Sequence, residues 1–342
     1  MRVETTILPN DIKSIGEAAR NLEAAGYDSI VTPEAGHDPF LPLMTVAEHT
    51  STLRFGTGVA IAFPRSPMVT AQIAWDLQRY SGGRFMLGLG TQVKGHNERR
   101  YSTAWPSPPG PRLKDYIATM KAIFKTFQTS ERPAHQGPYY QFTLISPFFN
   151  PGPNAAGAEH VPIYISAVNR YNCKLVGELC DGIRMHAFNT PKYTEEVIIP
   201  AIKEGAQNAG RDYSDIDLIG GAFIITGNNE EEVEKAKSPV RQQLSFYAST
   251  RVYHPVLEIH GWQDTGEKLF RLSMEGKWPE MAQSITDEML EQFAIIGTYD
   301  ELVPKIKERY AGVVTTLDFG FGVRSPDEHE RLAFIVSELK KL

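Results

Sequence analysis

Eight times along this chain, a short run of β-branched and other apolar residues is followed by a longer segment with helical periodicity. The first run, residues 2–8, precedes a segment whose apolar residues recur every three to four positions up to Gly26. The alternation then continues to the C-terminus. The expected strands are residues 2–8, 28–32, 54–62, 84–90, 161–167, 181–187, 215–226 and 311–321.

Strands that alternate with helices pair in parallel, and eight such units close on themselves as a barrel. Because no change in composition divides the 342 residues, we expect one domain over 1–342, an α/β fold of the (β/α)8 or TIM-barrel class. The segments near 129–160 and 250–285 do not fit plain units. We expect both to be insertions that cover part of the barrel mouth.

The composition excludes several classes of partner. The net charge is −6 and basic residues are scattered, whereas a nucleic-acid-binding surface needs a basic stripe. No apolar run reaches the ~18 residues of a membrane span, and the first residues lack the apolar core of a signal peptide. Cys173 and Cys180 lie two turns apart in a helical segment, too far to bridge, and no metal-ligand motif occurs. We therefore expect a cytoplasmic protein that binds small molecules, without metal, nucleic acid or membrane.

One junction between strand and loop stands out. The strand at 84–90 ends in LGLG and is followed at once by polar residues that include Thr91, Gln92 and His96. In a barrel of this kind, ligands bind in the loops that follow the carboxyl ends of the strands. These side chains are therefore expected to line a pocket.

The loop after the second strand carries Glu34 and His37 in the stretch TPEAGHDPF. A histidine beside a carboxylate suits proton transfer, because imidazole titrates near neutral pH. In the alternative interpretation, Asp38 caps a helix that starts at Asp38-Pro39 and His37 is solvated.

Three further features fall at the same end of the barrel. Gly56 and Gly58 interrupt the third strand, which indicates a bulge or a close approach of backbone to ligand, or else tight packing. Asn169 and Arg170 open the helix after the fifth strand, which favours either an anion site or an ordinary capped helix. His186 follows the sixth strand, where it is either a site residue or a packing residue.

Several longer stretches resemble one known family. SGGRFMLGLG, the preceding FGTGVAIAFPRSPMVTAQIAWDLQRYSGGR and the later PIYISAVNRYNCKLVGELCDG resemble the bacterial luciferase-like flavin-dependent oxidoreductases. The resemblance extends from HDPFLPL through RPAHQGPYYQFTL to FAIIGTYDELVPKIKERYAG, which is most of the chain. GTQVKGHNERRYS, IHGWQD and SMEGKWPEM are similar to the branch that depends on the deazaflavin coenzyme F420.

The resemblance implies a coenzyme with its ring system in the barrel mouth. In this family a non-prolyl cis peptide in the third strand supports the ring, and backbone N–H groups after the fifth strand bind the coenzyme's phosphate. The loop after the fourth strand also meets the ring. The cofactor-binding residues implied here are Gly58, Val59, Thr91, Gln92, Ala167, Val168, Asn169 and Arg170.

The chain departs from the family pattern at its expected proton-transfer groups. Glu34 stands where several deazaflavin enzymes carry a histidine, and Val93 stands where some carry a glutamate. The catalytic residues are therefore expected to be Glu34 or His37, which would exchange a proton with substrate, and His96, which would polarise the reacting group or contact the ring.

The resulting prediction is an F420-dependent oxidoreductase that transfers a hydride between deazaflavin C5 and a small alcohol, ketone or enone. The alternatives are a monooxygenase that uses reduced FMN and oxygen, and a barrel that binds such a molecule without turnover. The resemblance also implies a homodimer. Exposed cations favour the oligoglutamate tail of F420, and aromatic residues are candidates for an apolar substrate wall. The cations are Lys94, Arg99, Arg100 and Arg170, and the aromatics are Phe40, Trp105, Phe148, Trp262 and Trp278.

Overall fold

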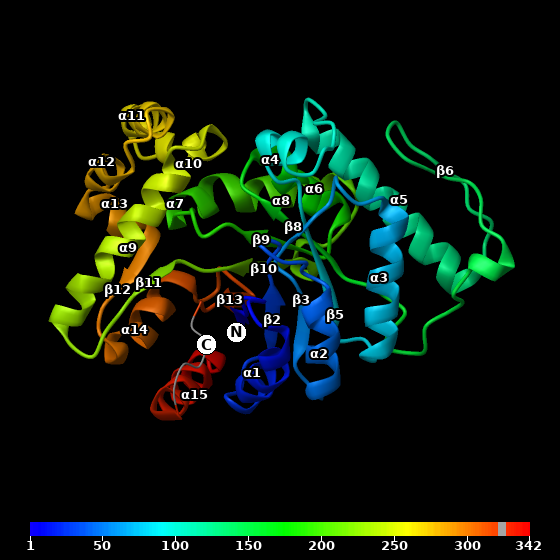
Figure 1. The fold of residues 1–342 in the computed structure, drawn as a ribbon, viewed down its shortest axis with the longest axis horizontal. Helices are drawn as coiled ribbons and strands as arrows, with labels where there is room; N and C mark the ends of the chain where they lie inside the picture. The colour runs from blue at the N-terminus through cyan, green and yellow to red at the C-terminus, as the bar shows by residue number, and fades with distance from the viewer. Residues whose placement is uncertain (321–325) are drawn as a thin grey trace.

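Eight parallel strands close into a barrel that is surrounded by helices (Figure 1). The structure is a computed structural model that describes residues 1–320 and 326–342. The barrel strands are β1 (Arg2–Thr6), β2 (Ser29–Thr32), β3 (Arg54–Thr57), β5 (Phe85–Gly90), β8 (Ile163–Ala167), β9 (Gly182–Met185), β10 (Asp217–Gly220) and β13 (Thr316–Asp318). They run in the order β3-β2-β1-β13-β10-β9-β8-β5, and pairing between β3 and β5 closes the ring. The predicted TIM barrel is confirmed, although Phe321 at the end of the eighth expected strand lies outside the described residues.

Two of the expected strands are each broken into two pieces. The third continues after Thr57 as β4 (Ala60–Ile61), and the seventh continues as β11 (Phe223–Ile225). β11 leaves the barrel and pairs with β12 (Ala294–Ile296), a short strand that the sequence pattern missed. The break in the third strand contains a cis peptide between Gly58 and Val59, as the resemblance implied.

Helices follow the strands, and most of them cover the outside of the barrel, whereas α4 (Lys94–Arg99) lies at its mouth (Figure 1). The others are α1 (Ile12–Ala24), α2 (Leu41–His49), α3 (Pro67–Tyr80), α5 (Pro109–Thr129), α6 (Arg170–Leu179), α7 (Pro191–Tyr193) continued by the π-helical turn η2 (Thr194–Ile198) and α8 (Ile199–Asn208), α14 (Tyr299–Tyr310) and α15 (Pro326–Lys340), with a 3-10 turn η3 (Tyr213–Asp215) before β10. Ser66 caps α3 as predicted. Helix α2 starts later than expected, because the Asp38 carboxylate accepts the N–H groups of Phe40 and Leu41 and so fixes the turn before the helix.

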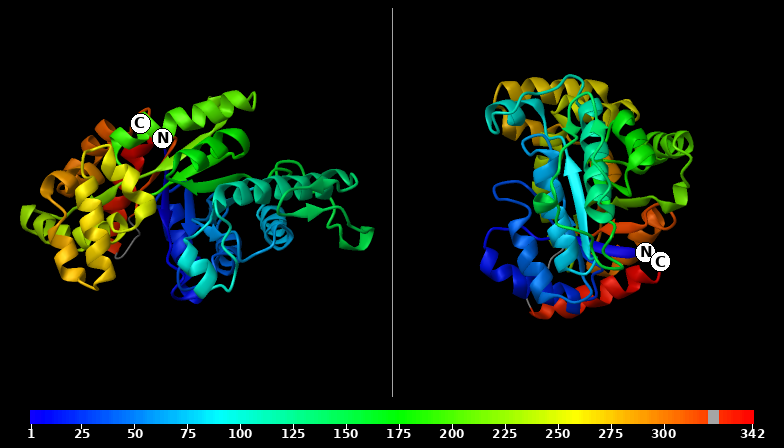
Figure 2. Two further views of the ribbon diagram at one scale, coloured as in Figure 1. Left: turned by 90° about the horizontal axis from the view of Figure 1, so that it is seen from above. Right: turned by 90° about the vertical axis from the view of Figure 1, so that its right-hand side faces the viewer.

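The first insertion lies along α5 rather than over the mouth. A hairpin of β6 (His135–Gln136) and β7 (Gln141–Phe142), followed by the 3-10 turn η1 (Pro147–Phe149), projects from the barrel beside α5 (Figure 2). Buried Asp115 of α5 holds the hairpin by accepting hydrogen bonds from Tyr139 N and Tyr140 N at 2.7 and 2.8 Å. The expectation that this segment covers the mouth was wrong, because its contacts run to the side of a helix.

The second insertion is helical and larger than the expected 250–285. It runs through α9 (Glu230–Ala248), the 3-10 turn η4 (Arg251–Tyr253), α10 (His254–Glu258), α11 (Gln263–Met274), α12 (Trp278–Gln283) and α13 (Asp287–Phe293). These helices pack together on one side of the barrel (Figure 1). Thr250 and the turn η4 of this insertion line the cavity at the barrel mouth, as described below.

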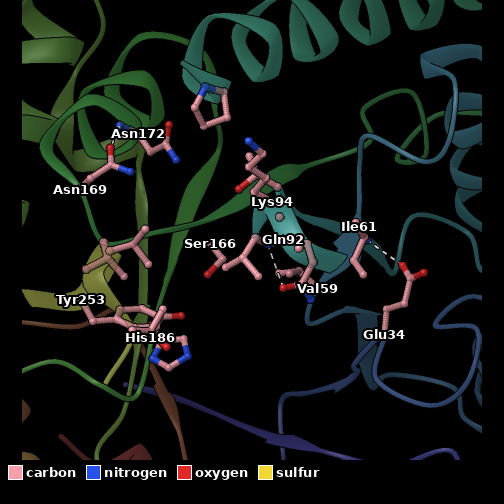
Figure 3. A pocket seen from close by; sticks show the side chains of 18 of the residues that line it. Glu34, Val59, Ile61, Gln92, Lys94, Ser166, Asn169, Asn172, His186 and Tyr253 are labelled. Atoms are coloured by element: carbon pink, nitrogen blue, oxygen red, sulfur yellow. Dashed lines mark hydrogen bonds between the residues drawn. The ribbon is translucent and has the colours of Figure 1, made fainter. Parts of the chain in front are cut away.

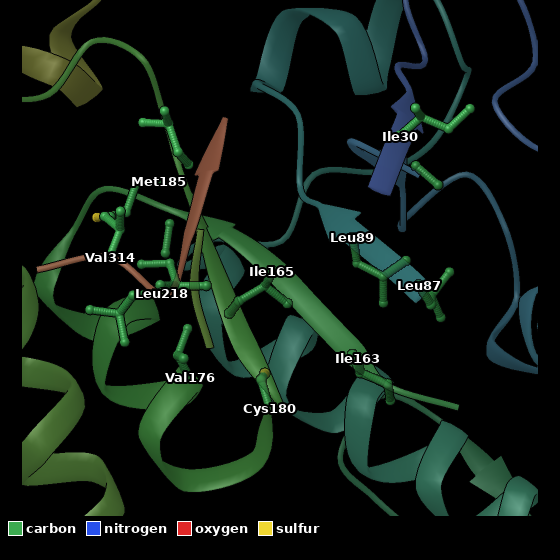
Figure 4. Packing of buried hydrophobic residues seen from close by; sticks show 14 of the residues in the cluster. Ile30, Leu87, Leu89, Ile163, Ile165, Val176, Cys180, Met185, Leu218 and Val314 are labelled. Carbon is green, nitrogen blue, oxygen red and sulfur yellow. The ribbon is translucent and has the colours of Figure 1, made fainter. Parts of the chain in front are cut away.

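Most of the core lies between the strands and the surrounding helices. Figure 4 shows one part of it, where Val176 of α6 faces Ile165 and Leu218 of the strands. The barrel interior is more polar. Glu4 of β1 and Arg184 of β9 form a buried ion pair there, and both neighbour Asp318 of β13. Burial, and then the negative charge of Glu4, raise the pKa of Asp318 to about 7.

Two smaller expectations concern the cysteines and membranes. Cys173 and Cys180 are both free and buried, as predicted, and burial raises the pKa of each thiol to about 12. Within 1–320 and 326–342, no helix combines the length and apolar character needed to cross a bilayer.

Candidate functional site

A cavity of about 670 Å³ opens at the carboxyl ends of the strands (Figure 3). Its lining comes from the loops after the second to sixth strands and from η4 of the second insertion. This is where the fold places ligands. Of the eleven site residues predicted from the sequence, seven line it: Glu34, Gly58, Val59, Thr91, Gln92, Val168 and Asn169.

The floor of the cavity is backbone with almost no spare room beneath it. A Cβ added to Gly58 would lie 2.5 Å from Cγ2 of Val31, and one added to Gly90 would lie 2.7 Å from Cγ2 of Val59. Each glycine therefore allows a neighbouring strand to approach more closely than any side chain would permit. Tight packing therefore accounts for Gly58, which also lines the cavity.

Glu34 joins three segments of the cavity wall. Its Oε2 accepts hydrogen bonds from Ile61 N in β4 and from Nη1 of Arg65, both at 2.7 Å, and its Oε1 accepts one from the Tyr101 hydroxyl at 3.1 Å. Burial, and then the Glu34 carboxylate, raise the pKa of Tyr101, so this phenol stays protonated and donates. Arg65 also pairs with Asp38. The carboxylate is 6% exposed and accepts hydrogen bonds on both oxygens. It therefore fixes the position of β4 relative to the loop after β5.

The loop after β5 is held by a side chain that sequence reasoning missed. Fully buried Asn97 donates from Nδ2 to the carbonyl oxygens of Thr91 and Val93 at 2.9 and 3.2 Å. Gln92 adopts a left-handed φ of 57°, and its side chain accepts the N–H of Val93 at 2.9 Å. A non-glycine residue in this conformation is uncommon and is often found at ligand sites. The loop is thus rigidly shaped towards the cavity.

The start of α6 forms another wall and carries free hydrogen-bonding groups. Asn169 caps the helix by accepting Asn172 N at 2.9 Å. The first N–H groups of a helix have no partner within the helix, and they attract anions. Asn172 lines the cavity, and its Oδ1 is buried with no hydrogen-bond partner in the described part of the chain. Ala167 is buried behind this wall, and the Arg170 side chain turns to solvent and pairs with Glu204.

His186 lines the cavity at its far side from Glu34 (Figure 3). Its Nδ1 accepts the N–H of Phe188 at 2.9 Å, which leaves the ring proton on Nε2. The rings of Tyr247 and Tyr253 pack against the imidazole with centroid distances of 4.6 and 4.8 Å. Desolvation by burial lowers the pKa of His186 to about 4, so the ring is neutral at physiological pH.

The two histidines that were predicted as catalytic lie outside the cavity lining. His37 is exposed in the loop after β2 and His96 is exposed on α4, and neither belongs to the cavity lining. The Asp38 cap and the Asp38–Arg65 pair fix the loop that carries His37. Among the aromatic candidates, only Trp105 lines the cavity. Phe40 is core, Phe148 is 89% exposed on the first insertion, Trp262 stacks on His260 and Trp278 lies on the outer face of the second insertion.

The second insertion was expected to cover part of the barrel mouth, but none of its residues at the cavity was predicted. Thr250, Arg251, Val252 and Tyr253 of the η4 region line the cavity. Arg251 is 63% exposed, lies over the Phe270 ring and is 3.7 Å from Glu267. Nothing local in STRVYH marks these residues, because their position follows from the docking of the whole insertion. Across the described ranges, no three His, Cys, Asp or Glu side chains gather as metal ligands.

Comparison with known proteins agrees with this architecture. The family described as "Luciferase-like monooxygenase" matches residues 2–316. An uncharacterised protein of Mycobacterium tuberculosis is 39% identical over 307 residues, 90% of this chain and 89% of its own length. The coenzyme F420-dependent tetrahydromethanopterin reductase of Methanopyrus kandleri superposes with a TM-score of 0.79 at 23% identity, covering 99% and 98% of the two chains. An F420-dependent secondary alcohol dehydrogenase, solved with an F420–acetone adduct, superposes with a TM-score of 0.74 at 17% identity over 99% and 98%.

Proposed function

Because this chain belongs to the luciferase-like monooxygenase family, we propose that it is an oxidoreductase that uses coenzyme F420 to transfer a hydride to or from a small organic substrate. The observation that carries the proposal is the cavity itself, with a backbone floor at Gly58–Val59 and a free helix start at α6 on one side. The two F420-dependent proteins of like fold support the choice of coenzyme.

The residues present fit a coenzyme of this type. A flat ring system needs close access to backbone, and Gly58 and Gly90 both line the cavity without a side chain of their own. The unpaired N–H groups at the start of α6 would donate hydrogen bonds to a phosphate. Oδ1 of Asn172, which has no partner in the described residues, would accept a hydrogen bond from a hydroxyl group of the chain between ring and phosphate. The proposed binding residues are thus Gly58, Val59, Thr91, Gln92, Ala167 through backbone, Val168, Asn169 and Arg170 through backbone, with Asn172 added.

The bound deazaflavin would supply the hydride chemistry, and the protein's own residues would position it. Val59 and the Thr91–Gln92 loop, which line the cavity, would hold the ring. Glu34 is the only one of the three proposed catalytic residues that lines the cavity. Its carboxylate already accepts three hydrogen bonds, so we assign it the role of a positioning residue that holds Ile61 and Tyr101 in place.

An FMN-dependent monooxygenase is the second candidate, favoured by the description of the matching family. The two coenzymes differ beyond the phosphate, where F420 continues as an anionic tail. Lys94 and Arg251 line the cavity with exposed fractions of 67% and 63%, and both would be available to such a tail.

A parallel titration of the apoprotein with F420 and with FMN tests the proposal. We expect F420 to bind at least ~10-fold more tightly, and Lys94→Gln to weaken F420 more than FMN. Equal or tighter binding of FMN, together with oxygen consumption by the reduced complex, would contradict the proposal and favour the monooxygenase.

A further inference from the structure

The side of the cavity around His186 differs from the side around Glu34, because aromatic rings rather than a salt-bridge partner contact the titratable side chain there. Burial lowers the pKa of His186 to about 4 and so keeps the imidazole neutral. Its neighbours are the rings of Tyr247 and Tyr253, from α9 and η4 of the second insertion. The charged residues of the lining, Lys94 and Arg251, are largely exposed at the mouth, and Glu34 is bound on the opposite side (Figure 3).

The ring of His186 has one nitrogen fixed and one available. Nδ1 is occupied by the Phe188 N–H, so Nε2 carries the proton. Within the described residues, Nε2 has no hydrogen-bond partner and is not fully enclosed. The N–H therefore remains available to a molecule in the cavity. A neutral N–H donor beside two aromatic rings suits a neutral oxygen acceptor, because a carboxylate or phosphate buried there would lose its hydration without gaining an opposite charge from the imidazole.

From this geometry we infer that His186 is a substrate-binding residue whose Nε2–H donates a hydrogen bond to the carbonyl oxygen of a neutral ketone or enone. The inference rests on the proposed function and names the substrate class of the same cavity. In the reduction, the carbonyl carbon receives a hydride from the reduced deazaflavin and forms a new C–H bond. The C=O electron pair moves to oxygen, where a proton from water completes the alcohol, and the coenzyme is left oxidised. The His186 N–H stabilises the negative charge that develops on oxygen without being transferred.

Two conservative substitutions separate this role from a purely structural one. The side-chain oxygen of asparagine takes the place of Nδ1, so His186→Asn keeps an acceptor for Phe188 N–H and loses the donor facing the cavity. The amide nitrogen of glutamine takes the place of Nε2, so His186→Gln keeps that donor and loses the acceptor. If His186 only supports the turn, the asparagine variant is the better tolerated of the two. If it binds substrate, the glutamine variant is.

The test uses protein loaded with oxidised F420, into which cyclohexanone is titrated while the fluorescence of the bound coenzyme is followed. We expect His186→Asn to raise the Kd for cyclohexanone by about 3- to 10-fold, the loss of one hydrogen bond, and His186→Gln to stay within about 2-fold of the unsubstituted protein. With reduced F420, kcat/KM for cyclohexanone should follow the same order. His160→Asn serves as control, because His160 is 65% exposed just before β8, at the opposite end of the barrel.

The outcomes distinguish the inference from the function on which it rests. Absence of F420 binding by the unsubstituted protein would refute the proposed function. If F420 binds normally, three results would each overturn only the inference. These are no saturable response to cyclohexanone, tighter binding of 4-oxocyclohexanecarboxylate than of cyclohexanone, or a lower Kd for cyclohexanone in the asparagine variant than in the glutamine variant.

Discussion

Breaking the Glu34–Arg65 pair should reveal how strongly it holds the cavity wall. The two side chains are 6% and 17% exposed and meet at 2.7 Å. Removing one member of a fully buried pair costs about 3–5 kcal/mol, because the other charge is left alone. Arg65 keeps a second partner, Asp38, at 3.0 Å and is less than fully buried. A charged hydrogen bond in such a setting contributes about 1.5–3 kcal/mol, so we expect a coupling free energy near 2 kcal/mol.

A double-mutant cycle measures this coupling directly. The free energy of unfolding in urea would be determined at pH 7 for the unsubstituted protein, Glu34→Gln, Arg65→Met and the double variant. The matched control is the exposed pair Glu231–Lys235 on α9, at 2.6 Å with exposed fractions of 78% and 72%. Its coupling should be only about 0.3–0.5 kcal/mol. A Glu34–Arg65 coupling no larger than that of the control would refute the assignment.

The same variants distinguish positioning from proton transfer at Glu34. If Glu34 holds the wall, Glu34→Gln and Arg65→Met should lower activity to a similar extent, because each breaks the ion pair that holds the Glu34 carboxylate beside Ile61 and Tyr101. If Glu34 transfers a proton, Glu34→Gln should abolish turnover while Arg65→Met retains most of it. Steady-state kcat of both variants, with coenzyme binding measured separately, decides between these roles.

Three further predictions follow from packing and charge. Gly58→Ala should destabilise the protein by about 1–3 kcal/mol and weaken coenzyme binding, whereas Gly36→Ala, which has nothing within 4 Å, should do neither; urea unfolding and F420 titration check both. The pKa of Asp318 is raised to about 7 in the folded state, so the free energy of unfolding falls as pH rises from about 4 to 7. Asp318→Asn should remove this pH dependence, which is on the order of 2–4 kcal/mol. Equal urea midpoints of the unsubstituted protein at pH 5 and pH 8 would contradict the prediction. Cys173 and Cys180, buried with pKa values near 12, should resist a thiol reagent until the protein unfolds, and rapid labelling of the native protein would refute this.

The barrel could be predicted from sequence because its signal repeats eight times and each unit carries its own periodicity. The exceptions arise where pairing depends on distant residues. The run 215–226 was expected to be one strand, but its second half pairs with Ala294–Ile296, a three-residue strand too short to show a pattern. The first insertion was misplaced because Asp115, which holds it, looks like any helix residue in the sequence.

The site was predictable to the level of loops but not of side chains. The carboxyl ends of the strands identified the right loops, and seven predicted residues line the cavity. Which way a loop residue points depends on partners far along the chain: Glu34 is fixed by Arg65 and Tyr101, 31 and 67 residues away. The environment of His186 depends on Tyr247 and Tyr253, which lie about 60 residues further along the chain in the second insertion, so the sequence around His186 did not indicate it.

The central claim is that a deazaflavin ring lies on the Gly58–Val59 floor with its phosphate at the start of α6. A crystal structure of the protein with bound F420 tests this most directly. The account predicts the ring in contact with Val59 and the Thr91–Gln92 loop, and phosphate oxygens within hydrogen-bond distance of the first N–H groups of α6. A coenzyme bound elsewhere, or with its phosphate away from α6, would contradict it.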